Sequence, residues 1–76
     1  MMGRNAAGLD LFDVVALLAD DPGQGLAAGQ VGTVVEKLDQ GTVLVEFADE
    51  NGRAYALATC RRADLLVLRY APDAAA

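Results

Sequence analysis

The chain has 76 residues, 54% of them hydrophobic, and carries 6 basic against 11 acidic side chains, for a net charge of −5. A chain of this length forms one domain with a small core, which excludes a multidomain architecture. The acidic balance weighs against a protein that binds nucleic acid or an anionic membrane, because such proteins need a basic face to neutralise phosphates. It permits a basic protein partner.

No apolar run approaches the roughly 20 residues of a membrane helix, and the first residues lack the grading of a signal peptide. The single cysteine, Cys60, cannot form an internal disulfide, which agrees with a reducing compartment. We therefore expect a cytoplasmic protein. Small and polar residues at 1–8 predict a disordered leader, and residues 71–76 predict a disordered tail. The folded domain is expected at residues 9–70.

Short β-branched and apolar runs recur along the chain and predict five strands. They lie at residues 13–19, 31–38, 42–47, 54–59 and 65–69. The first run also suits one face of a helix, but the Asp-Asp-Pro-Gly turn at residues 20–23 ends it early, which favours a strand. A long glycine-containing loop is expected at residues 20–30, and one helical turn at residues 60–64 precedes the last strand.

Alternation along the third predicted strand indicates its core face. Val43, Val45 and Phe47 share one side of that strand, so we expect them to point inward. On the fourth strand, the large side chains Tyr55 and Leu57 are the expected inward residues.

The Asn-Gly pair at residues 51–52 is the strongest turn signal, because both residues tolerate the left-handed backbone of a type I′ hairpin. Five short strands, a long first loop, two hairpins and one helical turn before the last strand are together typical of SH3-like barrels. The sequence therefore predicts an all-β protein, in the form of a small five-stranded SH3-like barrel.

An ordered set of motifs resembles a known family. The runs are LFDVVALL at residues 11–18, GQVGTVVE at 29–36, VEF at 45–47, GRAYAL at 52–57 and DLL at 64–66. Over residues 9–68 the chain is similar to a bacterial family of domains of unknown function, the 4926 family. The resemblance implies an SH3-like fold in a small stand-alone protein, and it transfers no functional residue. It also suggests an antitoxin or immunity protein, or an accessory subunit of a neighbouring gene product.

Candidate catalytic residues are few, because the chain contains no histidine. Cys60 is the only candidate nucleophile, and the adjacent Arg61 and Arg62 would favour its thiolate. No general base stands nearby in the sequence, so the preferred interpretation is an ordinary partly buried cysteine in a turn. We expect no enzymatic activity, no catalytic residue, no cofactor and no metal site.

Charged residues offer a candidate partner site. Asp20 and Asp21 begin the long first loop, which commonly lines the binding surface of SH3-like domains, and they would meet basic side chains of a ligand. Arg61 and Arg62 would contact an acidic partner, although pairing within the chain, for example with Asp64, is the simpler interpretation. The candidate partner-binding residues are therefore Asp20, Asp21, Arg61 and Arg62.

Two classes of function follow from these observations. The first is a non-enzymatic protein–protein interaction module, because apolar residues on both faces of the first, second and last strands exceed what so small a core can bury. Its partner would be another protein or a second copy of the chain, with an edge strand as the simplest contact. The alternative is a domain associated with nucleic acid or ribonucleoprotein, since residues 29–32 are similar to the start of KOW motifs. The acidic charge makes this alternative the weaker one.

Overall fold

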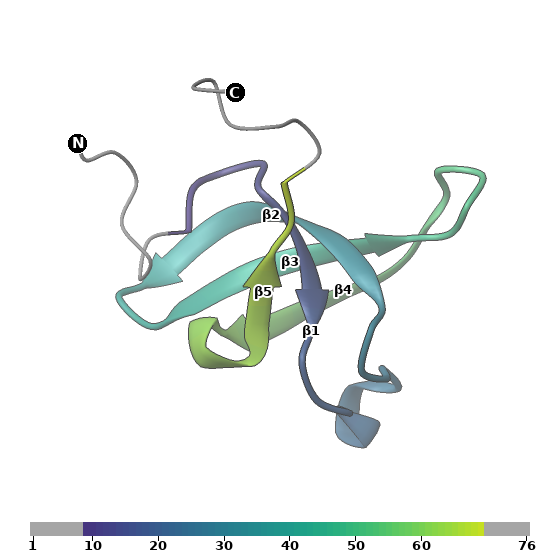
Figure 1. Ribbon diagram of the computed structural model, residues 1–76, viewed down its shortest axis with the longest axis horizontal. Coiled ribbons are helices and arrows are strands. Elements are labelled where there is room, and N and C mark those ends of the chain that lie inside the picture. Colours follow the sequence, from purple (N-terminus) through teal and green to yellow (C-terminus); the bar gives the residue numbers. More distant parts are fainter. Residues whose placement is uncertain (1–8, 70–76) are drawn as a thin grey trace.

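The structure of the protein is a computed structural model, and it describes residues 9–69 (Figure 1). Five antiparallel strands form one sheet in the order β4-β3-β2-β1-β5. The strands are β1 (Val14–Leu17), β2 (Val31–Asp39), β3 (Thr42–Ala48), β4 (Ala54–Arg61) and β5 (Leu65–Val67). Two single 3₁₀ turns accompany them, η1 (Pro22–Gln24) in the first loop and η2 (Arg62–Asp64) before β5.

The predicted all-β class is confirmed, with its five strands, its long first loop and its single helical turn before the last strand. The first apolar run forms a strand and not a helix. The leader expected at residues 1–8, the tail expected at 71–76 and the last predicted domain residue, Tyr70, lie outside the described residues.

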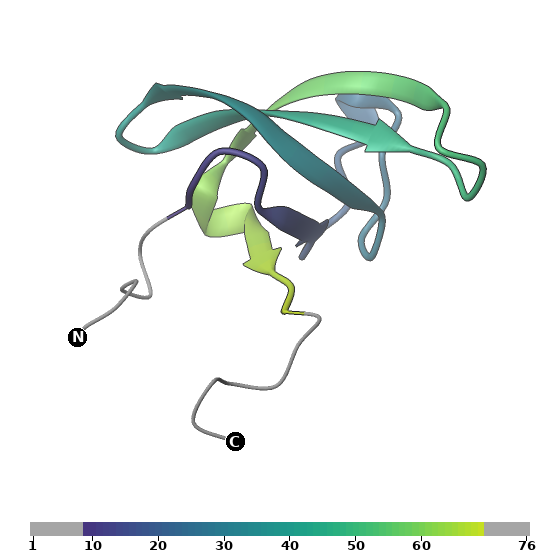
Figure 2. The same ribbon diagram turned by 90° about the horizontal axis from the view of Figure 1, so that it is seen from above.

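The sheet is strongly curved. β1 and β5 lie across one face of the ribbon that β2, β3 and β4 form (Figures 1 and 2). β4 and β5 are the two edges of the sheet, and the turn η2 connects them. Among residues 9–69, no hydrogen-bonded pairing joins these two edges, so closure into an SH3-like barrel stays a prediction.

The hydrophobic core lies inside this curve. Val15, Val34, Val45 and Phe47 are fully buried. β2 and β3 place Val34 opposite Val45, and opposite residues of an antiparallel pair share a face. The inward set predicted for β3, which also includes the buried Val43, is therefore confirmed. The other core members are Leu9, Leu17, Leu26, Ala58, Cys60 and Leu65.

The inward residues predicted for β4 are wrong. Tyr55 is 48% exposed and Leu57 is 60% exposed, whereas Ala58 and Cys60 are buried. The register of β3 and β4 places Ala58 opposite Val45, so the small side chains of β4 take the core face. The large side chains of β3 already fill that space, and only small residues fit against them.

The turn between β3 and β4 also differs from the predicted type I′ hairpin. The Asp49 N–H donates to the Arg53 carbonyl, and the Gly52 N–H donates to the Asp49 carbonyl, both at 2.9 Å. Gly52 has a φ of 82°, and Asn51 is not among the described residues with positive φ. Asp49 Oδ1 accepts the N–H groups of Asn51 and Arg53, which stabilises a three-residue loop with one left-handed glycine instead.

Phe12, shortly before β1, has an unusual backbone. Its φ is 70°, in the left-handed region, which costs a residue with a side chain about 1–2 kcal/mol. Hydrogen bonds fix this conformation, because the Phe12 N–H donates to the Val34 carbonyl at 2.7 Å and the Val34 N–H donates to the Asp13 carbonyl at 2.9 Å. The Phe12 side chain is 71% exposed, so burial does little to offset the backbone cost.

Candidate functional site

The first loop folds back toward β4 and is held there by side-chain and backbone hydrogen bonds. Asp21 and Leu26 exchange two backbone hydrogen bonds, of 2.9 and 3.0 Å, which close the loop around η1. Gln24 then reaches β4, where its Nε2 donates to the Thr59 carbonyl at 3.1 Å. The loop is therefore tied to the edge strand of the sheet.

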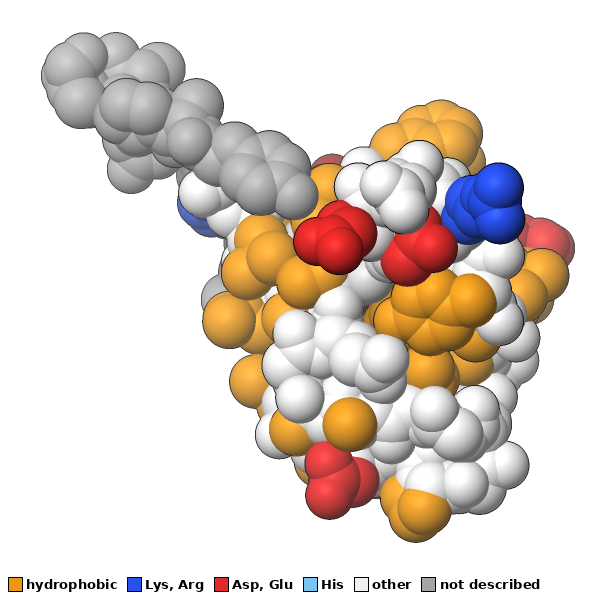
Figure 3. All heavy atoms as spheres, turned by 90° about the vertical axis from the view of Figure 1, so that its right-hand side faces the viewer, with side chains coloured by type: hydrophobic (Ala, Val, Ile, Leu, Met, Phe, Trp, Pro, Cys, Tyr) orange, Lys and Arg blue, Asp and Glu red, His pale blue; other side chains and the backbone are white. Residues whose placement is uncertain are grey.

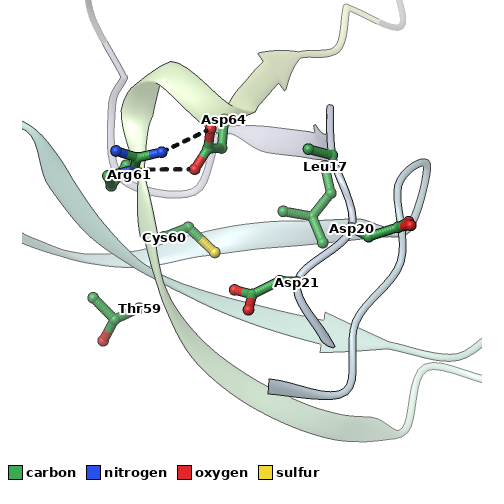
Figure 4. A pocket seen from close by; sticks show the side chains of 8 residues that line it. Leu17, Asp20, Asp21, Thr59, Cys60, Arg61 and Asp64 are labelled. Atoms are coloured by element: carbon green, nitrogen blue, oxygen red, sulfur yellow. Dashed lines mark hydrogen bonds and ion pairs between the residues drawn. The ribbon is translucent and has the colours of Figure 1, made fainter. Parts of the chain in front are cut away.

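A hollow of about 260 Å³ lies between this loop, the end of β1 and the junction of β4 with η2 (Figure 4). Its lining residues are Leu17, Ala19, Asp20, Asp21, Thr59, Cys60, Arg61 and Asp64. The hollow brings together three of the four candidates from the sequence, namely Asp20, Asp21 and Arg61. We call it the acidic hollow, because three of its lining residues are aspartates.

Asp20 and Asp21 shape the loop as well as lining the hollow. Asp20 Oδ1 accepts the Ala28 N–H at 2.9 Å, and Asp21 Oδ2 accepts Gln24 Nε2 at 2.5 Å. Both donors are neutral, so these bonds position the two carboxylates without cancelling their charge. The hollow can therefore accept a positively charged group.

Arg61 forms an ion pair with Asp64, which also lines the hollow. Arg61 Nε donates to Asp64 Oδ2 at 3.2 Å, and its Nη2 lies 3.5 Å from Asp64 Oδ1 (Figure 4). This pairing within the chain is the simpler of the two interpretations that the sequence offered for Arg61. Because Arg61 is largely exposed, the pair contributes little to stability. It offsets one of the three negative charges of the hollow.

Cys60 is not an activated thiol. It belongs to β4 and not to the helical turn, and its side chain is buried. Burial raises the pKa of the Cys60 thiol above its usual value, and the carboxylates of Asp21 and Asp64 raise it further. The pKa of the thiol is thus shifted upward, opposite to the effect expected from the adjacent arginines. A neutral, buried thiol is a poor nucleophile.

We expect Cys60 to react with iodoacetamide at pH 8 more slowly than free cysteine does, by at least about tenfold, because both burial and the raised pKa suppress the thiolate. The rate is measured by mass spectrometry on the folded protein. Denaturation in urea should restore the rate of an ordinary thiol. A folded-state rate above that of free cysteine would contradict this assignment and revive a nucleophilic role.

Arg62, the fourth candidate, lies outside the acidic hollow. Its N–H donates to the Gly41 carbonyl at 2.9 Å, which fixes η2 against the turn between β2 and β3. Arg62 also borders a second, more open hollow of about 600 Å³. The residues that line this basic hollow, as we call it, are Lys37, Leu38, Asp39, Gln40 and Arg62.

Several large hydrophobic side chains lie at the surface. Eight of them are exposed in the described part of the chain, namely Leu11, Phe12, Leu18, Val31, Leu38, Tyr55, Leu57 and Leu66. Leu66 of β5 lies opposite Ala16 of β1, and Ala16 lies opposite Val31 of β2. Cross-strand neighbours are about 5 Å apart, so these three residues form a continuous apolar row on the outer face. Figure 3 shows hydrophobic side chains at the surface on one side of the molecule, with acidic groups among them.

The sequence did not reveal the hydrophobic part of the acidic hollow. Leu17 contributes a lining side chain there, but the first strand is apolar on both faces, so alternation could not show which residues point inward. Asp64 stood out only as a partner for Arg61. Asp64 ends the predicted helical turn at residues 60–64, which begins with Cys60 and contains Arg61. That turn was a signal that Arg61 and Asp64 would lie near Cys60.

The fold and these surfaces define a small all-β domain with an acidic hollow and an exposed apolar row. The chain belongs to a family described as "Domain of unknown function (DUF4926)", whose family model matches residues 11–67. Neither the curated proteins nor the solved structures include one that matches the chain.

Two kinds of site are absent from residues 9–69. No three or more histidine, cysteine, aspartate or glutamate side chains gather there in a way that could hold a metal ion. The helical segments in this part of the chain are single 3₁₀ turns, and none is long and apolar enough to cross a membrane.

Proposed function

We propose that the protein is a non-enzymatic protein–protein interaction module of the bacterial cytoplasm. It acts as an antitoxin-like or immunity-like protein, or as an accessory subunit of a neighbouring gene product. The observation that carries this proposal is the apolar row of Leu66, Ala16 and Val31 on the outer face of three adjacent strands. Single exposed hydrophobic residues are common, but a continuous exposed patch usually marks an interface.

Leu18 extends the row toward the acidic hollow. The Leu18 side chain is exposed, and its N–H donates to the Asp64 carbonyl at 2.9 Å. A partner that covers the row would therefore reach the rim of the hollow. A partner that fits both surfaces would present an apolar side chain to the row and an arginine or lysine to the acidic hollow. The basic side chain would be attracted because Asp20 and Asp21 keep the hollow negative. The raised pKa of Cys60 supports a binding role over a catalytic one.

Replacing Leu66 with glutamine tests this proposal. The tagged protein should recover one protein at about equal stoichiometry from a nuclease-treated lysate of its own cells. Leu66→Gln should reduce the recovered amount at least about tenfold, as expected for a central interface residue. Recovery is measured by quantitative mass spectrometry, and circular dichroism confirms that the variant is folded.

Leu57→Gln is the matched control. Leu57 is also exposed, but it lies on β4 and outside the row, so this change should leave recovery unchanged. Equal recovery by both variants would contradict the assigned surface. In a parallel recovery from lysate without nuclease, nucleic acid recovered without a protein partner would favour the KOW-like alternative.

A further inference from the structure

Beyond this partner surface, we propose that Asn51 is a site of spontaneous deamidation in the folded protein. The backbone nitrogen of Gly52 attacks the side-chain amide of Asn51, and Asp49 slows the reaction by holding the turn closed. The modification replaces a neutral amide with a carboxylate, so the chain gains one negative charge. It needs no partner and does not depend on the apolar row.

The side chain of Asn51 is free to react. Asn51 is exposed in the turn between β3 and β4, and Figures 1 and 2 both show this turn projecting from the end of the sheet. Its backbone N–H donates to Asp49 Oδ1, but its side-chain amide forms no hydrogen bond with any of residues 9–69. No hydrogen bond among these residues therefore holds the amide away from the backbone nitrogen that follows it.

Gly52 leaves the attacking nitrogen accessible. Because glycine has no Cβ atom, it hinders the approach to its own nitrogen less than any other residue does. A Cβ atom built on Gly52 would meet nothing within 4 Å, so the space beside this residue is open. The nitrogen and the amide belong to neighbouring residues, so the attack is intramolecular and closes a succinimide ring.

The reaction consumes only water. A bond forms between Gly52 N and Asn51 Cγ, and the bond between Asn51 Cγ and Nδ2 breaks. The Gly52 nitrogen loses its proton to solvent, Nδ2 takes up a proton, and ammonia leaves. Water then opens the succinimide at one or the other of its carbonyl carbons, which yields aspartate or isoaspartate.

Asp49 holds the turn in a conformation that slows the attack. The Gly52 N–H donates to the Asp49 carbonyl at 2.9 Å, so the attacking nitrogen must leave this hydrogen bond before it loses its proton. Asp49 Oδ1 accepts the N–H groups of Asn51 and Arg53 at 2.9 and 3.0 Å, which stabilises the same turn. Exposed turns open far more often than the core of a protein does. The hydrogen bonds therefore slow the reaction and do not prevent it.

A second amide–glycine pair, Gln40 and Gly41, provides a comparison within the chain. It lies in the turn between β2 and β3, and Gln40 is also exposed. The Gly41 N–H donates to Asp39 Oδ1 at 2.9 Å, and the Gly41 carbonyl accepts the Arg62 N–H at 2.9 Å. Attack on a glutamine must also close a larger ring, which brings the reacting atoms together less readily. Gln40 should therefore stay unmodified while Asn51 reacts.

Peptide mapping by mass spectrometry tests the proposal on the full chain, incubated in a mildly alkaline native buffer. The folded wild type should gain the mass of a deamidation at Asn51 at least about tenfold faster than at Gln40. The same protein denatured in guanidinium chloride gives the rate of the open turn. A folded protein that shows no gain at Asn51 while the denatured protein reacts would overturn the proposal.

Two aspartate variants test the role of Asp49. Asp49→Ala removes the carboxylate that holds Asn51 and Arg53, so the folded variant should deamidate about fivefold faster, as expected from the loss of two hydrogen bonds. Asp39→Ala is the matched control, because Asp39 accepts a backbone N–H in the other turn, and it should leave the rate at Asn51 unchanged. Circular dichroism confirms that both variants are folded. An Asp49→Ala rate no higher than that of the wild type would contradict the assigned role of Asp49.

Discussion

Phe47→Ala should lower the free energy of unfolding by about 3–5 kcal/mol. Phe47 is fully buried and is the largest such side chain. Its cross-strand neighbours are Gly32 on β2 and Ala56 on β4. Because neither has a side chain that can move into the vacated space, the cavity would stay open. A loss of this size is a large part of the about 5–15 kcal/mol that stabilises a typical domain.

Urea unfolding followed by far-ultraviolet circular dichroism measures the effect, since the chain has no tryptophan for fluorescence. Leu57→Ala is the control, because Leu57 is exposed on β4, and its change should stay within about 0.5 kcal/mol. A Phe47→Ala variant as stable as the control would show that the core does not centre on this residue.

Gly32→Ala should destabilise the fold by about 1–3 kcal/mol or more, even though it adds a single methyl group. A Cβ atom at Gly32 would lie 2.6 Å from Val45 Cγ1, 2.8 Å from the Glu46 carbonyl oxygen and 2.9 Å from Phe47 Cδ1. Two of these atoms belong to fully buried side chains and the third to the backbone, so none can move away easily. The glycine is required by close packing of β2 on β3 and not by a left-handed backbone.

Gly41→Ala is the matched control for this change. A Cβ atom at Gly41 meets nothing within 4 Å, and Gly41 is not among the described glycines with positive φ. The substitution should therefore be neutral or slightly stabilising. Both variants are compared by their urea midpoints. Equal midpoints would mean that β2 and β3 can separate to admit a side chain at Gly32. That result would contradict the prediction.

The strands were predictable because β3 alternates clearly and turn residues punctuate the chain. β4 was predicted with the wrong face inward, since its alternating pattern contains large residues on one side and small ones on the other. Hydrophobicity alone favours the large side as the core. Which face of β4 points inward depends on the space that Val43, Val45 and Phe47 leave in the core. That space exists only once the sheet has assembled, so the sequence of β4 alone does not show it.

The acidic hollow was partly predictable. Asp20 and Asp21 could be assigned to a binding loop from their place after the first strand, and they do line the hollow. Arg61 and Arg62 are adjacent in the sequence, yet they border different hollows because Arg61 ends β4 and Arg62 begins η2. The backbone of Phe12 could not be foreseen, because no local pattern predicts a left-handed phenylalanine.

The hydrogen bonds between the first loop and β4 affect how readily the edge of the sheet can pair with another molecule. An open edge strand can recruit strands from other molecules and start amyloid-like growth. Gln24 occupies the Thr59 carbonyl on this edge, and Gln30 Nε2 donates to the Tyr55 hydroxyl at 2.9 Å. The opposite edge, β5, has only three residues. Each edge of the sheet thus offers an added strand fewer free backbone groups, because the Thr59 carbonyl of β4 is occupied and β5 is short.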